Sequence, residues 1–196
     1  MPVPQRTTAA RRRLLQWACG AALLQRAASC AAAQAFPDLR VRQLQERPRQ
    51  LWVTRPDAQE SARVVYWADS RIQWEGYSAL NRLYRDVHAN VLRPMHIGLL
   101  DLNYFLQEAV GRLYSPRPMI LLSGYRTPAT NALVGGVVPN VHGAGQAGDF
   151  YYEGLSLHEN YRLARSFQVG GLGMYPDRGF LHKDVGPLRS WVTTRP

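Results

Sequence analysis

The chain has 196 residues, 46% of them hydrophobic, and a formal net charge of +10. This is enough material for one globular domain with its own core and too little for two. Both cysteines, Cys19 and Cys30, fall within the first 35 residues, which excludes a thiol mechanism and a cysteine-ligated zinc site from the rest of the chain.

Residues 1–35 have the order of an export signal. The basic run Arg11–Arg13 precedes an apolar segment, Leu14–Leu24, and small residues follow. The same start matches a twin-arginine signal. The apolar segment falls well short of the roughly 20 residues that cross a bilayer, so we expect a cleaved signal, a periplasmic protein and no stable membrane span. Lipid attachment at Cys30 is an alternative.

Residues 1–35 hold five arginines and no acid, which leaves a formal excess of +5 for the remainder. A modest excess of this kind suits a polyanionic surface such as a cell wall. No basic helix or stacked-aromatic pattern favours nucleic acid, so we expect no nucleic-acid partner.

Residues 36–62 alternate Arg, Gln and Pro with few apolar clusters, which predicts a mostly irregular lead-in with one edge strand at Leu51–Val53. The domain proper is expected at 63–196, and it begins with an apolar, β-branched strand at Arg63–Trp67. Apolar residues at helical spacing then predict helices at Ser78–Val91 and Ile97–Tyr114.

The second half of the chain alternates short strands with short helices. The expected elements are a strand at Met119–Leu122, a helix at 128–134, a strand at Gly148–Tyr152, a helix from the capping box Ser156–Glu159 to about Phe167, and strands at Gly170–Tyr175 and Phe180–Val185. Helices first and hairpins later predict an α+β fold: a single domain with a small antiparallel sheet flanked by helices.

Two histidines and one carboxylate are candidates for a metal site. His142 and Asp149 bracket a segment too rich in glycine for a stable helix, so it is expected to form a loop that folds back on itself. Strand alternation places His182 on the same face as Asp184. A hydrolytic zinc takes three such ligands and leaves one position open, so His142, Asp149 and His182 are the predicted ligands.

Three further residues have two or more interpretations. Arg126 directly follows a predicted strand and could clamp a substrate carboxylate, stabilise an oxyanion, or pair with a surface acid. Tyr125 could donate a hydrogen bond to substrate or only pack. Asp184 could orient a ligand, act as a base on water, or cap a turn.

Four motifs in this order resemble a known family. They are Ser123–Asn131, His142–Phe150, Gly170–Pro176 and the stretch from Phe180 to Arg189-x-Trp191. Together they look like the YcbK-like murein endopeptidases, which belong to the D-alanyl-D-alanine carboxypeptidase-like zinc metallopeptidases and share the fold of the hedgehog signalling domain. The similarity spans roughly residues 62–191.

The resemblance implies Zn²⁺ held by His142, Asp149 and His182, with Arg126 near the substrate, and cleavage of the peptide cross-links of peptidoglycan. Related peptidases often carry an acid three positions before the last histidine, where this chain has Gly179. Asp184 is therefore the base by elimination.

The chain departs from the family at two places. Asn140 replaces the usual serine before the first histidine, and a short apolar segment, 134–139, replaces a longer basic one. Both changes leave the predicted ligands in place and bear on substrate access or specificity. Apart from them, two rival interpretations of the chain are a catalytically inactive zinc domain that binds wall peptides or a protein partner, and an exported structural protein whose histidines are incidental.

Overall fold

The computed structural model describes residues 47–137 and 140–194. The predicted export signal and the first part of the lead-in lie outside the described residues. Within these ranges no helix combines the length and the apolar character needed to cross a membrane.

The described chain builds one mixed sheet of eight strands in the order β3-β2-β1-β4-β5-β7-β6-β8. The strands are β1 (Arg49–Arg55), β2 (Glu60–Ala68), β3 (Arg71–Ile72), β4 (Met119–Ser123), β5 (Ala147–Tyr151), β6 (Gly171–Tyr175), β7 (Phe180–Asp184) and β8 (Arg189–Val192). The α+β prediction is correct, but the expected small, purely antiparallel sheet is wrong. The sheet is large, and the β1–β4 and β6–β8 pairs are parallel.

The predicted strand at Leu51–Val53 is present as part of β1, but β1 is longer and lies between β2 and β4, so the expected edge position and the irregular lead-in are wrong from Arg49 onward. Leu51 and Val53 are fully buried. Arg55 takes the next inward position and is only 4% exposed, because its guanidinium donates to the Leu83 carbonyl at 2.9 Å and pairs with Asp57. An arginine at a buried position hides the alternation by which a strand is recognised.

Four α-helices occur among the described residues: α2 (Trp74–Leu83), α3 (Ile97–Leu113), α4 (Pro128–Leu133) and α5 (Leu157–Ser166). Three of them match the predicted segments within a few residues. The expected helix at Ser78–Val91 instead starts earlier and ends at Leu83, because the chain then closes a loop through the Asp86–Val91 bridge, with Asn90 at a φ of 52°.

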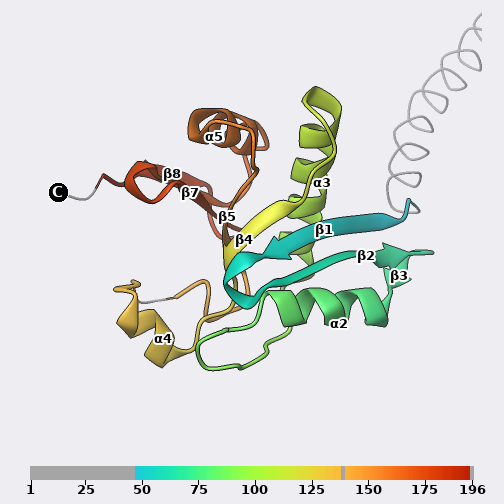
Figure 1. Ribbon diagram of the computed structural model, residues 1–196, viewed down its shortest axis with the longest axis horizontal. Helices are drawn as coiled ribbons and strands as arrows, with labels where there is room; N and C mark the ends of the chain where they lie inside the picture. Colours follow the sequence, from blue (N-terminus) through green and yellow to red (C-terminus); the bar gives the residue numbers. More distant parts are fainter. Residues whose placement is uncertain (1–46, 138–139, 195–196) are drawn as a thin grey trace, which may run out of the picture. The chain divides into compact units, whose positions relative to one another are not determined.

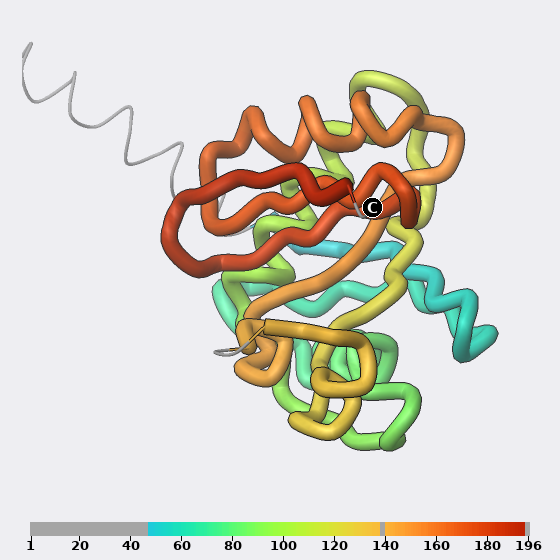
Figure 2. Tube along the Cα trace, turned by 90° about the vertical axis from the view of Figure 1, so that its left-hand side faces the viewer, coloured from blue at the N-terminus to red at the C-terminus, as the bar shows by residue number. Residues whose placement is uncertain are grey.

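The helices cover the sheet and share its core. Helix α2 packs on β2 and β1, α3 on β1, and α5 on β6 and β7. Figures 1 and 2 both show α4 beside the segment that follows α2. Asp86 makes this connection, because its carboxylate accepts from the backbone N–H and the hydroxyl of Thr127, each at 2.8 Å. The loop that carries Tyr125 and Arg126 is thereby held against the core.

Candidate metal centre

A tight turn positions His142 at the entrance of β5. The Asn140 side-chain oxygen accepts from the His142 backbone N–H at 3.0 Å, and the Gly145 N–H donates back to the His142 carbonyl at 3.0 Å. Gly145 has a φ of 68°, and a Cβ there would lie 2.8 Å from the Pro94 carbonyl oxygen. Glycine is thus required at this one position of the predicted loop, and Asn140 supports the turn.

Strand pairing brings the other two predicted ligands together. In the antiparallel pair β5–β7, Asp149 lies directly opposite His182. Cross-strand partners have Cβ atoms about 5 Å apart on one face, so their side chains meet. His142, Asp149 and His182 are all at least 94% buried.

The three side chains converge on a single point. His142 Nε2 lies 3.1 Å from His182 Nδ1, His182 Nδ1 lies 3.0 Å from Asp149 Oδ1, and His142 Nε2 lies 3.3 Å from the same oxygen. One candidate ligand atom from each residue falls within 4.8 Å of the other two.

Each imidazole has one nitrogen that faces away from the convergence point, and the hydrogen bond of that nitrogen determines whether the inward nitrogen carries a proton. His142 Nδ1 donates to the Gly124 carbonyl at 2.7 Å, because a carbonyl can only accept. His182 Nε2 donates to Asp184 Oδ2 at 2.9 Å. In the neutral tautomers the inward nitrogens therefore carry lone pairs. Two lone-pair nitrogens and a carboxylate oxygen, with no donor between them, fit a divalent cation such as Zn²⁺.

Arg126 fixes the carboxylate of the site. Its guanidinium pairs with Asp149 Oδ2, and its Nε donates to Ser123 Oγ at 2.7 Å. Asp149 Oδ1 is left for the converging nitrogens. The Arg126 side chain keeps 16% of its surface exposed.

Asp184 lies behind His182, on the side away from the convergence point. Its side chain is fully buried, and its Oδ1 accepts from the backbone N–H groups of Gly171 and Gly186 at 2.9 and 2.8 Å. Arg189 donates to Oδ2 at 2.6 Å. Both oxygens are therefore engaged by donors.

Burial shifts the pKa values of the site's carboxyl and imidazole groups in one direction, and their charged and hydrogen-bonded neighbours shift them in the other. Burial by itself would raise the pKa of Asp149, but His142, His182 and Arg126 lower it overall. The same balance lowers the pKa of Asp184, where hydrogen bonds from His182, Gly171, Gly186 and Arg189 outweigh burial. Both carboxylates are therefore anionic at neutral pH. Burial would lower the pKa of His182, yet its bonds to Asp149 and then Asp184 raise it.

Aromatic side chains line the same region. The Trp191 ring lies 5.4 Å from the His182 ring, and its Nε1 donates to Tyr175 Oη at 3.2 Å. Gly173 makes room for it, since a Cβ there would lie 2.5 Å from the indole. Trp191 thus forms a wall beside His182.

Tyr125 occupies the loop next to Arg126 but does not join the cluster. Its backbone N–H donates to the Tyr84 carbonyl at 2.7 Å, and the Arg93 guanidinium lies 5.8 Å from its ring centre. Within 47–137 and 140–194 no hydrogen bond links the Tyr125 hydroxyl to the predicted ligands.

The residues that sequence reasoning missed are those that hold the ligands in place: the Gly124 carbonyl, Ser123 and Arg189. The sequence does carry a signal for Arg189, because Arg189 and Trp191 are two residues apart on one strand, β8, and therefore lie on the same face. No local pattern marks a carbonyl or a serine as the partner of a distant side chain.

Comparisons with known proteins found a matching family model and several similar proteins. Residues 43–191 match the family model described as peptidoglycan L,D-endopeptidase MepK. The chain is 36% identical over 150 residues to the protein of that name from Escherichia coli strain K12, which covers 74% of this chain and 81% of the relative. It is 35% identical over 117 residues to a probable peptidoglycan L,D-endopeptidase MepK from Haemophilus influenzae, covering 57% of this chain and 62% of the relative.

Proposed function

The chain belongs to the peptidoglycan L,D-endopeptidase MepK family, and from this premise we propose that it is an exported, zinc-dependent enzyme that hydrolyses amide bonds in peptidoglycan cross-links. Its substrate lies outside the cytoplasmic membrane, so we propose a periplasmic location reached through the N-terminal signal.

The convergence of three acceptor atoms without a donor carries the zinc part of the proposal. His142 Nε2, His182 Nδ1 and Asp149 Oδ1 would hold the ion. A zinc ion at such a site supplies a Lewis acid that polarises an amide carbonyl and activates water.

Arg126 is the proposed substrate-binding and oxyanion-stabilising group. Because its Nε bond to Ser123 and its pairing with Asp149 hold the guanidinium in place, its remaining donors are preorganised for the oxygen that gains charge when an amide is attacked. Tyr125, on the same loop, is proposed to border the peptide.

Asp184 is proposed to orient His182, and not to serve as the base on water. Its Oδ2 contacts the nitrogen of His182 that points away from the convergence point, and the carboxylate is fully buried among donors. Hydrogen-bonded carboxylates behind a metal-binding histidine fix its tautomer and raise its basicity.

The family name favours one class of cross-link, in which the cleaved bond joins an L-configured to a D-configured centre. We propose that the enzyme prefers links between two diamino acids to those between D-alanine and a diamino acid. Digestion of purified muropeptide dimers of each kind, with zinc and with a chelator, tests this.

The expected result is conversion of the L,D-linked dimer to monomers, loss of cleavage with the chelator, and recovery on adding zinc. His142→Ala should be inactive at any zinc concentration. Intact dimers in the presence of bound zinc would contradict the proposal and favour the domain that only binds wall peptides.

A further inference from the structure

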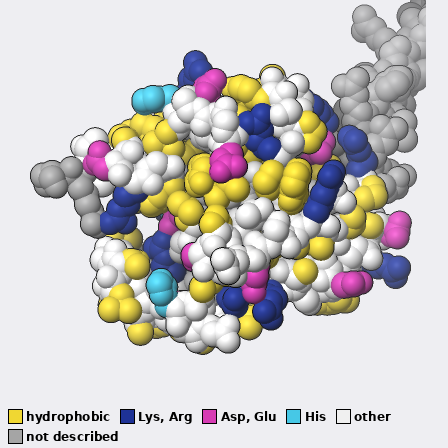
Figure 3. Space-filling model, in the orientation of Figure 1, with side chains coloured by type: hydrophobic (Ala, Val, Ile, Leu, Met, Phe, Trp, Pro, Cys, Tyr) yellow, Lys and Arg dark blue, Asp and Glu magenta, His cyan; other side chains and the backbone are white. Residues whose placement is uncertain are grey.

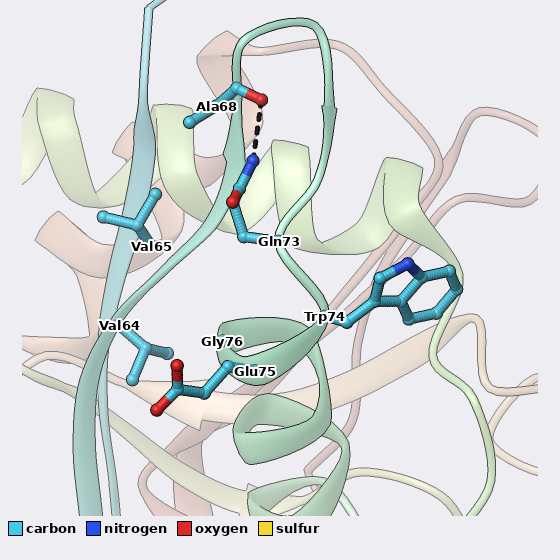
Figure 4. Close-up of a pocket in the computed structure, with 7 residues that line it drawn as sticks. All are labelled: Val64, Val65, Ala68, Gln73, Trp74, Glu75 and Gly76. Atoms are coloured by element: carbon cyan, nitrogen blue, oxygen red, sulfur yellow. Dashed lines mark hydrogen bonds between the residues drawn. The ribbon is translucent and has the colours of Figure 1, made fainter.

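An exposed tryptophan stands at the beginning of α2. Trp74 is the first residue of this helix, and its side chain is 68% exposed. Figure 4 shows the indole projecting away from Val64 and Val65 of β2. A ring of this size in water offers a large apolar face to a ligand.

The backbone beneath the indole is fixed to the sheet. The Gln73 N–H donates to the Tyr66 carbonyl at 2.9 Å, and its side-chain amide donates to the Ala68 carbonyl at 2.9 Å, as Figure 4 shows. At Gly76 a Cβ would lie 2.0 Å from the Val65 carbonyl oxygen. The first turn of α2 therefore sits directly on the β2 backbone.

The indole itself is braced on one side. Trp74 and Tyr77 meet edge to face, with ring centres 5.8 Å apart and planes at 73°. Tyr77 is buried and donates its hydroxyl proton to the Met95 carbonyl at 2.8 Å. A rigid aromatic side chain loses little conformational entropy when it binds a ligand.

Two surface hollows adjoin Trp74. One, of about 460 Å³, is lined by Arg71, Ile72, Gln73 and Trp74. The other, of about 360 Å³, runs along β2 to Glu75. Arg71 and Glu75 are exposed, and neither forms an ion pair within the part of the chain that the structure describes.

The charges of the two hollows cancel, because Arg71 lines one of them and Glu75 lines the other. An anionic lipid surface or a nucleic acid would instead require a cluster of cations. Figure 3 shows cationic and anionic side chains interspersed over the face in view. An exposed aromatic ring between two hollows, one lined by a hydrogen-bond donor and the other by an acceptor, matches a neutral, hydroxyl-rich ligand with an apolar face, which is the chemistry of a sugar.

Helix α2 links this surface to the cleavage site. It runs for ten residues from Trp74 to Leu83, about 15 Å at 1.5 Å per residue. The backbone carbonyl of the next residue, Tyr84, accepts a hydrogen bond from the Tyr125 N–H at 2.7 Å. A polymer with peptides branching from a glycan strand could place its sugar at one end of this helix and its peptide at the other.

We propose that Trp74, with Arg71 and Glu75 in the two adjoining hollows, binds the N-acetylhexosamine strand of peptidoglycan. This inference rests on the proposed function, which it deepens by assigning a second part of the same substrate.

Titration of the full chain with a hexamer of β-1,4-linked N-acetylglucosamine tests the site without any cleavage. Trp74→Ala is expected to weaken binding about tenfold, the loss of one aromatic stacking contact. Trp74→Phe should retain most of the affinity. Leu113→Ala, which removes another side chain that is 67% exposed, should have no effect.

Hydrolysis provides a second test. For Trp74→Ala the ratio of the rate on intact sacculi to the rate on sugar-free cross-linked peptides should fall about tenfold relative to wild type. The glycan site is refuted if wild type does not bind the hexamer, if Trp74→Ala binds it equally well, or if Trp74 instead governs binding to phosphatidylglycerol vesicles. Absence of hydrolysis by wild type would refute the peptidase function, and the titration would still decide the glycan site.

Discussion

Asp184→Asn separates two roles for the carboxylate behind the candidate metal site. The substitution keeps the size of the side chain and removes its charge. In the wild type, Asp184 Oδ2 accepts from His182 Nε2 at 2.9 Å. An asparagine that turns its amide nitrogen toward His182 would donate to Nε2, and the imidazole proton would then move to Nδ1, the atom that faces the convergence point.

If Asp184 orients His182, the variant should bind zinc about 10- to 100-fold more weakly, which corresponds to roughly 1.4 to 2.7 kcal/mol. Hydrolysis should recover largely when zinc is raised above the new dissociation constant. If Asp184 is instead the base on water, zinc affinity should be unchanged and hydrolysis should stay low at any zinc concentration.

The assay is zinc titration with a competing chelator, followed by muropeptide hydrolysis at limiting and saturating zinc. Asp69→Asn is the matched control, because Asp69 is exposed and its φ of 51° suits asparagine. Unchanged zinc affinity together with activity that zinc cannot restore would refute the orienting role. Thermal unfolding of each variant without metal checks that the fold persists.

Three other substitutions test hydrogen bonds and packing in the fold and beside the site. Burial would raise the pKa of Asp86, but hydrogen bonds, led by that from the Thr127 N–H, outweigh it and lower the pKa to about 2. The ionised carboxylate therefore adds its full contribution to the free energy of unfolding above pH 4, and this contribution is lost as the pH falls toward 2. Asp86→Asn should lower the free energy of urea unfolding by about 2 kcal/mol at pH 7 but by little near pH 2. Gln107→Leu should lower the free energy of unfolding by about 1 to 3 kcal/mol, because this side chain bonds both backbone groups of a β1 residue and the carbonyl of residue 117. Gly173→Ala should displace Trp191, lower the free energy of unfolding by about 1 to 3 kcal/mol and slow muropeptide hydrolysis. For any of the three variants, an unfolding free energy and a hydrolysis rate equal to those of the wild type would show that the contact is not needed.

Residue patterns were sufficient to propose the inner part of the site. Glycine content identified the loop at His142, and alternation placed His182 and Asp184 on one face. The structure brings the predicted ligands together through the pairing of Asp149 with His182. That register joins residues 33 apart, and nothing in either strand alone specifies its partner.

The outer part of the site and the place of β1 inside the sheet are not predictable in the same way. Arg189 lies on a short strand beyond a turn, and its pairing with Asp184 depends on how β8 lies beside β6. In β1, Arg55 is buried because backbone carbonyls from a distant segment accept from it. Tertiary contacts of this kind override local polarity, so the sequence pattern predicts only the apolar centre of β1, Leu51–Val53, and places it at an edge.

Metal analysis of the purified full chain tests the central claim most directly. The account predicts one equivalent of zinc per wild-type chain. The His142→Ala protein should retain less than a tenth of this amount under the same conditions. A variant of an exposed histidine, such as His96→Ala, should have the same zinc content as the wild type. A wild-type protein without stoichiometric zinc after exposure to the metal, or a His142→Ala protein that retains it, would contradict the account.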